Sequence, residues 1–393
     1  LNNNIKTVLC HQKEKPLSES IISLNSNEKL SFSFDDLDGD FKKYFYTIIH
    51  CSSEWEQSDL LESEYINGFH KKEIIDYEFS FNTLQKYTHY KFNFPDNNLR
   101  PVLSGNYILK IFEEGQSDNP IILHRFMVLE NKVNIEPNVK IATLFSDRKT
   151  KHEIDFIIKT FDLEIRNPYS EIKVKITQNN NDNNSIKNLR PIFIRNNQLI
   201  YDYEDINTLS ANNEFRYFDF KSLRYHSERI KNIIYDSAYN HVFLLPDKKR
   251  TFNQYSISPD INGKFIIQNQ EGWDSSTESD YALVYFTLHS EKINYGDIFI
   301  VGELSGWQLN NNFKMKYNYS KKAYEVSVYL KQGYYNYMYA LNDTVTKQVD
   351  ISYIEGSHYQ TRNTYQIYVY FKQDSEKYER LIGFTEVLSK ELF

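Results

Sequence analysis

The stretch from Gly296 to Ala340 constrains the fold more than any other part of the sequence, because its residue pattern describes a complete supersecondary unit. Asp297–Val301 is a nearly continuous apolar run, which is typical of a strand buried on both faces. Tyr324–Leu330 alternates apolar and polar residues with period 2, as a half-buried strand does. After a turn at Lys331–Gly333, Tyr334–Ala340 places three tyrosines on one face of a further strand. The stretch therefore predicts a small antiparallel β-sandwich.

The aromatic content extends this prediction to the whole chain. The 393 residues include 32 Tyr and 27 Phe, which pack well on the pleated, half-buried surfaces of sheets. Only 12 residues are Gly, so we expect asparagine to form many of the turns, because it tolerates left-handed backbone. We predict an all-β fold with very little helix, made of three consecutive antiparallel β-sandwiches: residues 1–130, 131–275 and 276–393.

The first 130 residues alternate strand patterns with polar turns. The expected strands are Leu30–Phe34, Tyr44–His50, Tyr77–Phe81, Asn106–Phe112 and Ile121–Leu129. The last two flank a Gln116–Pro120 turn and are expected to form a hairpin. Ser58–Asn67 has a Ser cap followed by loose helical spacing, which predicts at most one short helix.

The remaining residues repeat this alternation after an expected linker at Glu130–Lys132 and Asn134–Pro137. Further strands are expected at Ile154–Thr160, Ile172–Thr177, Pro191–Arg195, Leu199–Tyr203, His241–Leu245, Gly263–Ile267 and Tyr281–Leu288. The polar segment Gln178–Asn188 is interpreted as a long exposed hairpin tip. We place the boundary before the third sandwich in an acidic loop near Ser275.

Charge and composition exclude several classes of protein. A formal net charge of −7 provides no basic footprint for nucleic acid. No apolar run approaches the roughly 18 residues that a membrane-spanning helix needs. Two cysteines, Cys10 and Cys51, are too few for a disulfide framework. We expect them to be small buried thiols, with a single bridge between them as the alternative.

No motif in the sequence indicates an enzyme. The run Asp35–Asp40 is rich in carboxylates, but Gly39 comes too early for an EF-hand calcium loop, and Asp38-Gly39 predicts a hairpin turn. Ser305 lies in G-x-x-S-G rather than G-x-S-x-G, so it is not predicted to be a nucleophile. The carboxylates Glu54, Glu56, Asp59, Glu62 and Glu64 are interpreted as a solvated face. We therefore expect no catalysis, bound metal or cofactor.

The order of elements around Trp307 resembles that of the glycogen-binding, early-set Ig-like modules. The resemblance implies an Ig-like sandwich with a sugar stacked on Trp307. The sequence departs from the family at Met338, where the family has a lysine, and at Thr344–Thr346, where a second tryptophan would stand. Stacking without polar orienting groups specifies little, so we expect no glycan binding. We expect Trp307 to be a core or interface residue that packs on Tyr324 or Tyr335.

Six segments of the sequence, through their order and spacing, together resemble the plug protein of the type IX secretion system of Bacteroidota. They are Ser33–Phe69, Tyr77–Pro95, Ser104–Ile111, Asn213–Tyr225, Asp260–Gly272 and Glu355–Phe371. The resemblance implies a non-enzymatic periplasmic protein that binds the giant outer-membrane translocon barrel and occludes its periplasmic opening at rest. It implies no catalytic residue. A cargo-binding chaperone or receptor of the same system is the alternative.

A plug that must be released argues for a moderate, polar interface rather than an obligate hydrophobic one. Four residues are candidates for contact with the partner: Trp307, Trp273, Asn180 and Asn183. The sequence does not indicate which loops contact the barrel.

Overall fold

The computed structural model describes residues 4–161 and 163–389. It is mostly β, with 47% strand and 6% helix, as the aromatic content predicted. The helices are short: α1 (Glu62–Tyr65), α2 (Pro168–Glu171), α3 (Ser275–Glu278), α4 (Ser352–Glu355) and two 3-10 turns at Glu303–Ser305 and Asn311–Phe313. Helix α1 confirms the single short helix expected within 58–67. Among the described residues, no helix has the length and hydropathy needed to span a membrane.

The N-terminal part forms two facing sheets around one core. One sheet has the order β1-β3-β8-β7 and the other β2-β11-β10-β4-β6. Their strands are β1 (Ile5–Gln12), β3 (Leu30–Asp36), β8 (Thr88–Phe94), β7 (Tyr77–Phe79), β2 (Ile21–Ser23), β11 (Ile122–Leu129), β10 (Gly105–Glu113), β4 (Tyr44–Cys51) and β6 (Lys72–Glu73). A small ribbon, β5 (Ile66–Gly68) with β9 (Leu99–Pro101), lies beside them. Phe32 and Phe34 of β3 pack against Tyr44 of β4 and Tyr107 of β10 in the core. The hairpin β10–β11 is confirmed.

The turn at Asp38-Gly39 does not close a hairpin, contrary to the prediction. Strand β3 pairs with β1 and β8, whereas β4 lies in the opposite sheet. Gly39 adopts φ +71° and the chain crosses from one layer to the other. The alternation of buried residues in β3 and β4 is compatible with either arrangement, because it fixes only which face of each strand meets the core.

A second pair of facing sheets combines residues 134–210 with the C-terminal strands. One sheet has the order β12-β13-β17-β16 with β18 beside β13, and the other β15-β14-β30-β31. Their strands are β12 (Asn134–Ile141), β13 (Lys151–Lys159), β17 (Gln198–Tyr201), β16 (Phe193–Arg195), β18 (Thr208–Ser210), β15 (Asn181–Lys187), β14 (Ile172–Gln178), β30 (Thr364–Phe371) and β31 (Arg380–Leu388). Ile154, Val174 and Ile367 meet in their shared core.

Two expectations for this part were wrong. Asn134–Pro137 is not a linker but the start of strand β12, which pairs with β13 along its length. The segment 178–188 belongs to a hairpin, as expected, but it is not a long tip, because β15 runs back along β14 as an edge strand. The turn between them is only Asn179-Asn180, both with positive φ, a conformation that asparagine tolerates.

A third pair of facing sheets occupies residues 216–350. One sheet has β28 at its centre, paired with β19, β23, β25 and β29; the other has the order β20-β21-β24-β27-β26, with β22 beside β24. The strands are β19 (Arg216–Asp219), β20 (Ile230–Tyr235), β21 (Asn240–Leu244), β22 (Asp247–Lys248), β23 (Phe265–Ile267), β24 (Tyr281–His289), β25 (Gly296–Val301), β26 (Lys316–Asn318), β27 (Ala323–Lys331), β28 (Gly333–Asp343) and β29 (Val349–Asp350). Tyr335, Tyr337 and Tyr339 of β28 face the core, as their alternation predicted.

The sheet pairing departs from the expected domain boundaries. Strands β19–β23, expected in the second unit, pair with strands of the third, so the boundary near Ser275 falls inside one pair of sheets. Strands β30 and β31, expected in the third unit, lie in the sheet of β14. Not all pairing is antiparallel, because β2–β11, β21–β24 and β22–β24 are parallel. Period-2 alternation identifies a strand but not its neighbours.

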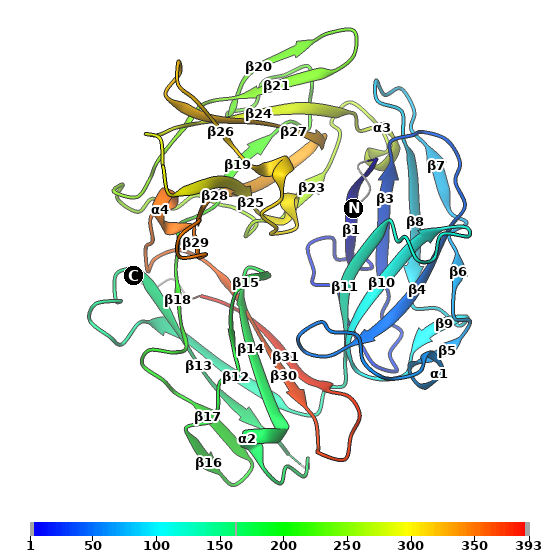
Figure 1. Ribbon diagram of the computed structural model, residues 1–393, viewed down its shortest axis with the longest axis vertical. Coiled ribbons are helices and arrows are strands. Elements are labelled where there is room, and N and C mark those ends of the chain that lie inside the picture. The colour runs from blue at the N-terminus through cyan, green and yellow to red at the C-terminus, as the bar shows by residue number, and fades with distance from the viewer. Residues whose placement is uncertain (1–3, 162, 390–393) are drawn as a thin grey trace.

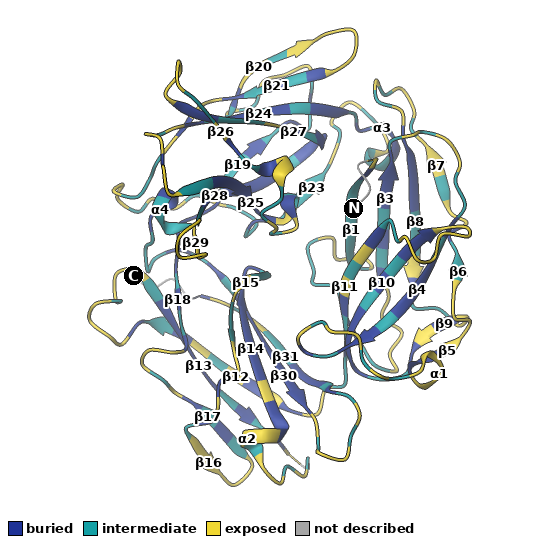
Figure 2. Cartoon of the chain, viewed as in Figure 1, coloured by how far each residue is buried: buried dark blue, intermediate teal, exposed yellow. Residues whose placement is uncertain are grey.

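The three pairs of sheets surround a central space (Figure 1). Each pair has its own buried interior, and exposed residues concentrate at strand ends and loops (Figure 2). Strand β15 projects toward this space from the second pair, β1 borders it from the first, and the loop after β25 reaches it from the third.

Candidate functional site

A cavity of about 2120 Å³ lies between the three pairs of sheets. Strands β1 and β11 line it from the first pair and β15 from the second (Figure 1). The third pair contributes residues of β24 and β27 and of the loop 303–314. All three pairs therefore meet at this cavity.

Three of the four residues expected to contact a partner line this cavity: Trp307, Asn180 and Asn183. The Asn183 side-chain amide donates a hydrogen bond of 2.5 Å to the backbone carbonyl of Trp307. This contact joins β15 of the second pair to the loop of the third. Trp273 lies elsewhere, just before α3, and its side chain is 100% exposed.

The indole of Trp307 packs on Phe215, with ring centroids 6.0 Å apart, rather than on Tyr324 or Tyr335 as expected. It belongs to a small cluster with Phe215, Met338 and Ala340 on the outer face of β28. Gly306 and Trp307 both have left-handed backbone, with φ of 59° and 58°. This turn directs the ring to the outer face, whereas Tyr335 faces the core on the opposite side of the strand.

A fully buried charge cluster joins the first and third pairs of sheets, and sequence reasoning missed it. Asp35 of β3 accepts from the Lys331 ammonium of β27 at 2.6 Å and from the Tyr281 hydroxyl of β24 at 2.7 Å. His89 Nδ1 lies 2.7 Å from the other carboxylate oxygen. Lys331 is also 4.0 Å from the centre of the Tyr87 ring. We call these residues the buried junction.

The electrostatics of the buried junction make its partners interdependent. Burial alone raises the pKa of the Asp35 carboxyl, but the Lys331 ammonium and His89 outweigh burial and hold this pKa below its usual value. Burial lowers the pKa of Lys331, and attraction to Asp35 offsets only part of that effect. The side chains of Lys331 and Asp35 are 1% and 0% exposed. Removing either one would leave an unpaired charge out of reach of water.

Strand β15 makes contacts of a different kind with both neighbouring pairs. Asp182 pairs with Arg125 of β11 at 2.9 Å, and Lys187 with Glu54 at 2.6 Å. All four of these side chains are between 34% and 54% exposed. Together with the Asn183–Trp307 hydrogen bond, these two ion pairs form what we call the β15 junction.

The contact between the first and second pairs is intermediate in character. The Tyr370 hydroxyl donates to the Asn106 carbonyl oxygen at 2.9 Å inside a small apolar cluster. The buried Glu379 accepts from the backbone N–H of Ser53 at 2.6 Å and pairs with Lys173. Burial alone raises the pKa of Glu379, but these hydrogen bonds outweigh burial and lower it. Tyr370 of β30 and Glu379 just before β31 thus hold a side chain and a backbone N–H of the first pair.

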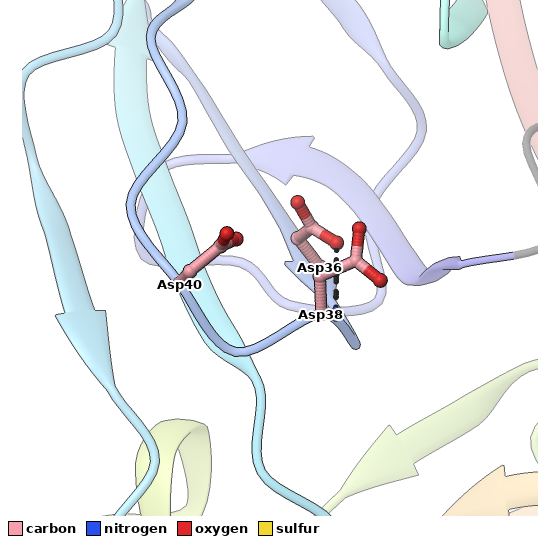
Figure 3. Close-up of side chains that lie close together, drawn as sticks. All are labelled: Asp36, Asp38 and Asp40. Carbon is pink, nitrogen blue, oxygen red and sulfur yellow. Dashed lines mark hydrogen bonds between the residues drawn. The ribbon is translucent and has the colours of Figure 1, made fainter.

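The carboxylate run of the sequence forms a real cluster, because Asp36, Asp38 and Asp40 lie close together after β3 (Figure 3). The Lys42 ammonium is 2.8 Å from Asp36 and 4.0 Å from Asp40, and it also contacts Asp38. Burial alone lowers the pKa of Lys42, but hydrogen bonds to Asp36 and Asp38 outweigh burial and raise it. The protein's own lysine therefore lies among these carboxylates and offsets part of their charge.

A second cluster is formed by Glu153, Asp155 and Asp202. It contains the Lys140 ammonium, at 3.0, 2.6 and 3.8 Å from these carboxylates. Here too a lysine occupies the place between the carboxylates. The exposed group Glu54, Glu56, Asp59, Glu62 and Glu64 is solvated, as expected.

Both cysteines are free thiols, as expected. Burial raises the pKa of Cys10 to about 12 and that of Cys51 to about 11. Both are therefore protonated at neutral pH and are poor nucleophiles. Ser305 donates to the carbonyl of Gly302 at 3.0 Å and is buried, which agrees with a structural role.

Comparison with known proteins gives two informative matches. Residues 5–130 match the family model described as type 9 secretion system plug protein 1st domain. The crystal structure of a hypothetical protein from Parabacteroides merdae ATCC 43184 has 34% sequence identity and a TM-score of 0.96, over 99% of this chain and 98% of that chain. Trypsin-activated alpha-2-macroglobulin from Escherichia coli aligns at 8% identity, over 98% of this chain and 29% of that chain, with a TM-score of 0.19. That likeness supports no argument. No curated protein matches the sequence.

Proposed function

The chain belongs to the type 9 secretion system plug protein family, and from this premise we propose that it is a non-enzymatic plug. It binds the outer-membrane translocon barrel of that system and occludes the periplasmic opening at rest. The family match over residues 5–130 carries the proposal. The protein acts in the periplasm, at the inner face of the outer membrane, through its contact with the barrel.

The joined arrangement of the sheets supports this function on physical grounds. A stopper must span an aqueous opening that is too wide for a single side chain to close, so it needs rigid bulk. Three pairs of sheets, each an Ig-like sandwich in this proposal, are linked by the buried junction and by Glu379. The β15 junction is more exposed, so the second pair is held less firmly through β15.

The test is the permeability of the outer membrane. Deleting the chain should admit large antibiotics or dyes, and the leak should disappear when the barrel is deleted as well. Complementation with the wild-type chain is the matched control. Unchanged uptake in the single deletion strain would contradict the plug function.

Trp273 is the proposed contact residue for the barrel. It is 100% exposed, and α3 beside it is joined to the first pair by a hydrogen bond of 3.0 Å from the Phe81 N–H to the Thr277 carbonyl. Phe81 is itself 70% exposed, so aromatic side chains from two pairs of sheets lie near this corner. Aromatic side chains commonly anchor protein interfaces.

Trp273→Ala should therefore reduce co-purification with the barrel from detergent-solubilised outer membranes. Phe252→Ala is the matched control, because Phe252 is 96% exposed but lies by α4. An equal loss in both variants, or in neither, would remove Trp273 from the interface.

The central cavity favours a second candidate, a receptor or chaperone for exported cargo, because a cavity bordered by three pairs of sheets can hold a ligand. Affinity capture separates the two functions. A plug is retained with the empty barrel and leaves when substrate loads, whereas a cargo receptor follows the substrate.

A further inference from the structure

The central cavity is basic although the chain as a whole is acidic. The chain has 46 Lys and Arg against 53 Asp and Glu, but among the residues that line the cavity, basic side chains outnumber acidic ones two to one. The lining therefore carries a net positive formal charge, whereas the chain as a whole is negative.

Several cations of the cavity have no carboxylate partner. Arg125 shares Asp182 with a lysine, and Lys321 pairs with Glu325. By contrast, Lys6, Lys231 and Lys316 form no ion pair with any described residue. Burial lowers the pKa of Lys6 because it disfavours the charged ammonium. A bound anion would offset this unfavourable effect.

The size and the borders of the cavity indicate the kind of anion. At about 2120 Å³ it exceeds the roughly 300–1,000 Å³ of small-molecule pockets. Edge strands line it, among them β1, β15, β20 and β26, and each pairs with a neighbour on one side only. An extended peptide adds readily to such edges through main-chain hydrogen bonds.

The spacing of the unpaired lysines fits an extended chain. Lys231 on β20 and Lys316 on β26 lie at opposite edges of the same sheet. Four strand spacings separate these edges by about 19 Å. A peptide of about 12 residues spans about 40 Å when extended, so one segment that crosses the strands can reach both lysines.

We propose that the central cavity binds an acidic, extended polypeptide segment, whose carboxylates pair with Lys6, Lys231 and Lys316. This binding is a property of the chain alone and does not depend on the plug function. A competing explanation for lysines on edge strands is protection against aggregation, and the experiment must separate the two.

Binding is measured by fluorescence anisotropy on the purified full-length chain, with labelled peptides of alternating Glu-Thr, Gln-Thr or Lys-Thr, about 12 residues long. We expect saturable binding of the Glu-Thr peptide only, weakening as salt is added. The variant Lys6→Gln/Lys231→Gln/Lys316→Gln should bind it at least about tenfold more weakly, a change of about 1.4 kcal/mol. The matched control is Lys13→Gln/Lys86→Gln/Lys149→Gln, which changes three exposed lysines outside the cavity and should bind normally.

Thermal melting checks that both triple variants fold. If the cavity variant does not, the single change at the exposed Lys316 is used instead. Hydrogen exchange then locates the peptide, and protection should be confined to strands that line the cavity. Absence of saturable binding, equal binding of the Glu-Thr and Gln-Thr peptides, equal loss in the control variant or protection elsewhere would each overturn the inference.

Discussion

The buried junction joins the first and third pairs of sheets, the β15 junction joins the second pair to both others, and the two use opposite physical means. Lys331 and Asp35 meet out of contact with water, with a tyrosine hydroxyl and an imidazole completing the set. The β15 junction relies on two exposed ion pairs and one hydrogen bond to a backbone carbonyl. Breaking a buried pair leaves an uncompensated charge and costs several kcal/mol, whereas exposed pairs contribute little.

This difference indicates which contacts between the pairs of sheets are rigid and which can open. The first and third pairs of sheets are fastened by a cluster that tolerates no loss of a member. Strand β15 meets both neighbouring pairs through groups that are accessible to water, with two ion pairs to the first and one hydrogen bond to the third. The proposed plug function calls for both holding and release, which one joint of each kind would serve, and the variants below test this division.

The largest effect is expected from Lys331→Met at the buried junction. The substitution leaves Asp35 buried without its cation, so the free energy of unfolding should fall by about 3–5 kcal/mol. Urea unfolding followed by tyrosine fluorescence measures it. The double variant Lys331→Met/Asp35→Leu should recover much of the loss, because it removes both charges. Lys316→Met, at an exposed site on the neighbouring strand, is the control. If Lys331→Met lowers the free energy of unfolding no more than this control does, the expected difference between the two junctions is contradicted.

Trp307→Ala should have the next largest effect. The ring packs on Phe215 beside Met338 and is half-buried, so we expect a loss of about 2–3 kcal/mol, below the about 3–5 for a fully buried tryptophan. The Asn183 bond should survive, because it ends on the backbone carbonyl of residue 307. Thermal unfolding of the full chain measures the loss.

The same variant tests the absence of a sugar site. The full chain is needed, because residues 276–393 alone would separate β30 and β31 from β14. Neither wild type nor Trp307→Ala should be retarded in a native gel cast with glycogen or amylopectin. Retardation that the substitution abolishes, with an unchanged melting temperature, would show that Trp307 is a sugar platform rather than a packing residue.

A smaller, pH-dependent effect on stability is expected from a histidine in the wall of the central cavity. His124 of β11 lies against the Phe32 ring, and burial lowers its pKa to about 4, against about 6.5 in an unfolded chain. A depressed histidine pKa stabilises the fold above pH 6.5, and this stability is lost as pH falls toward 4.

Wild type should therefore lose on the order of 1–3 kcal/mol more than His124→Gln between pH 7 and pH 4.5. Asp35 contributes nothing in this range, because its lowered pKa places its loss below about pH 3.9. Chemical unfolding at several pH values separates the two groups. Identical pH slopes in wild type and variant would contradict the assignment to His124.

The smallest effect is expected at the β15 junction. Asn183→Ala/Lys187→Ala removes one hydrogen bond and one exposed ion pair, and should change the free energy of unfolding by less than about 1 kcal/mol. Amide exchange along β15 should nevertheless become faster, because the strand loses contacts with both neighbours. A destabilisation as large as that of Lys331→Met would show that both junctions are equally rigid.

The sequence by itself determined the strand content and which face of each strand is buried. The alternation in β3 and β27 is present in the structure, as are the inward-facing tyrosines of β28, the hairpin β10–β11 and the short helix. It also placed Trp307, Asn180 and Asn183 among the candidates that line the central cavity. These features depend on the spacing of apolar residues and on the residues of the turns, and both can be read from residues that are close in sequence.

Only the tertiary structure decided which strands are neighbours and which charges meet. Strand β30 pairs with β14 rather than with the strands before it, and Asp35 meets Lys331 across 296 positions of sequence. Each of these residues looked unremarkable in its own strand, since Lys331 ends one strand and Asp35 follows another apolar run. Period-2 spacing fixes the inward face of a strand, but long-range pairing depends on how whole sheets pack, which no local pattern records.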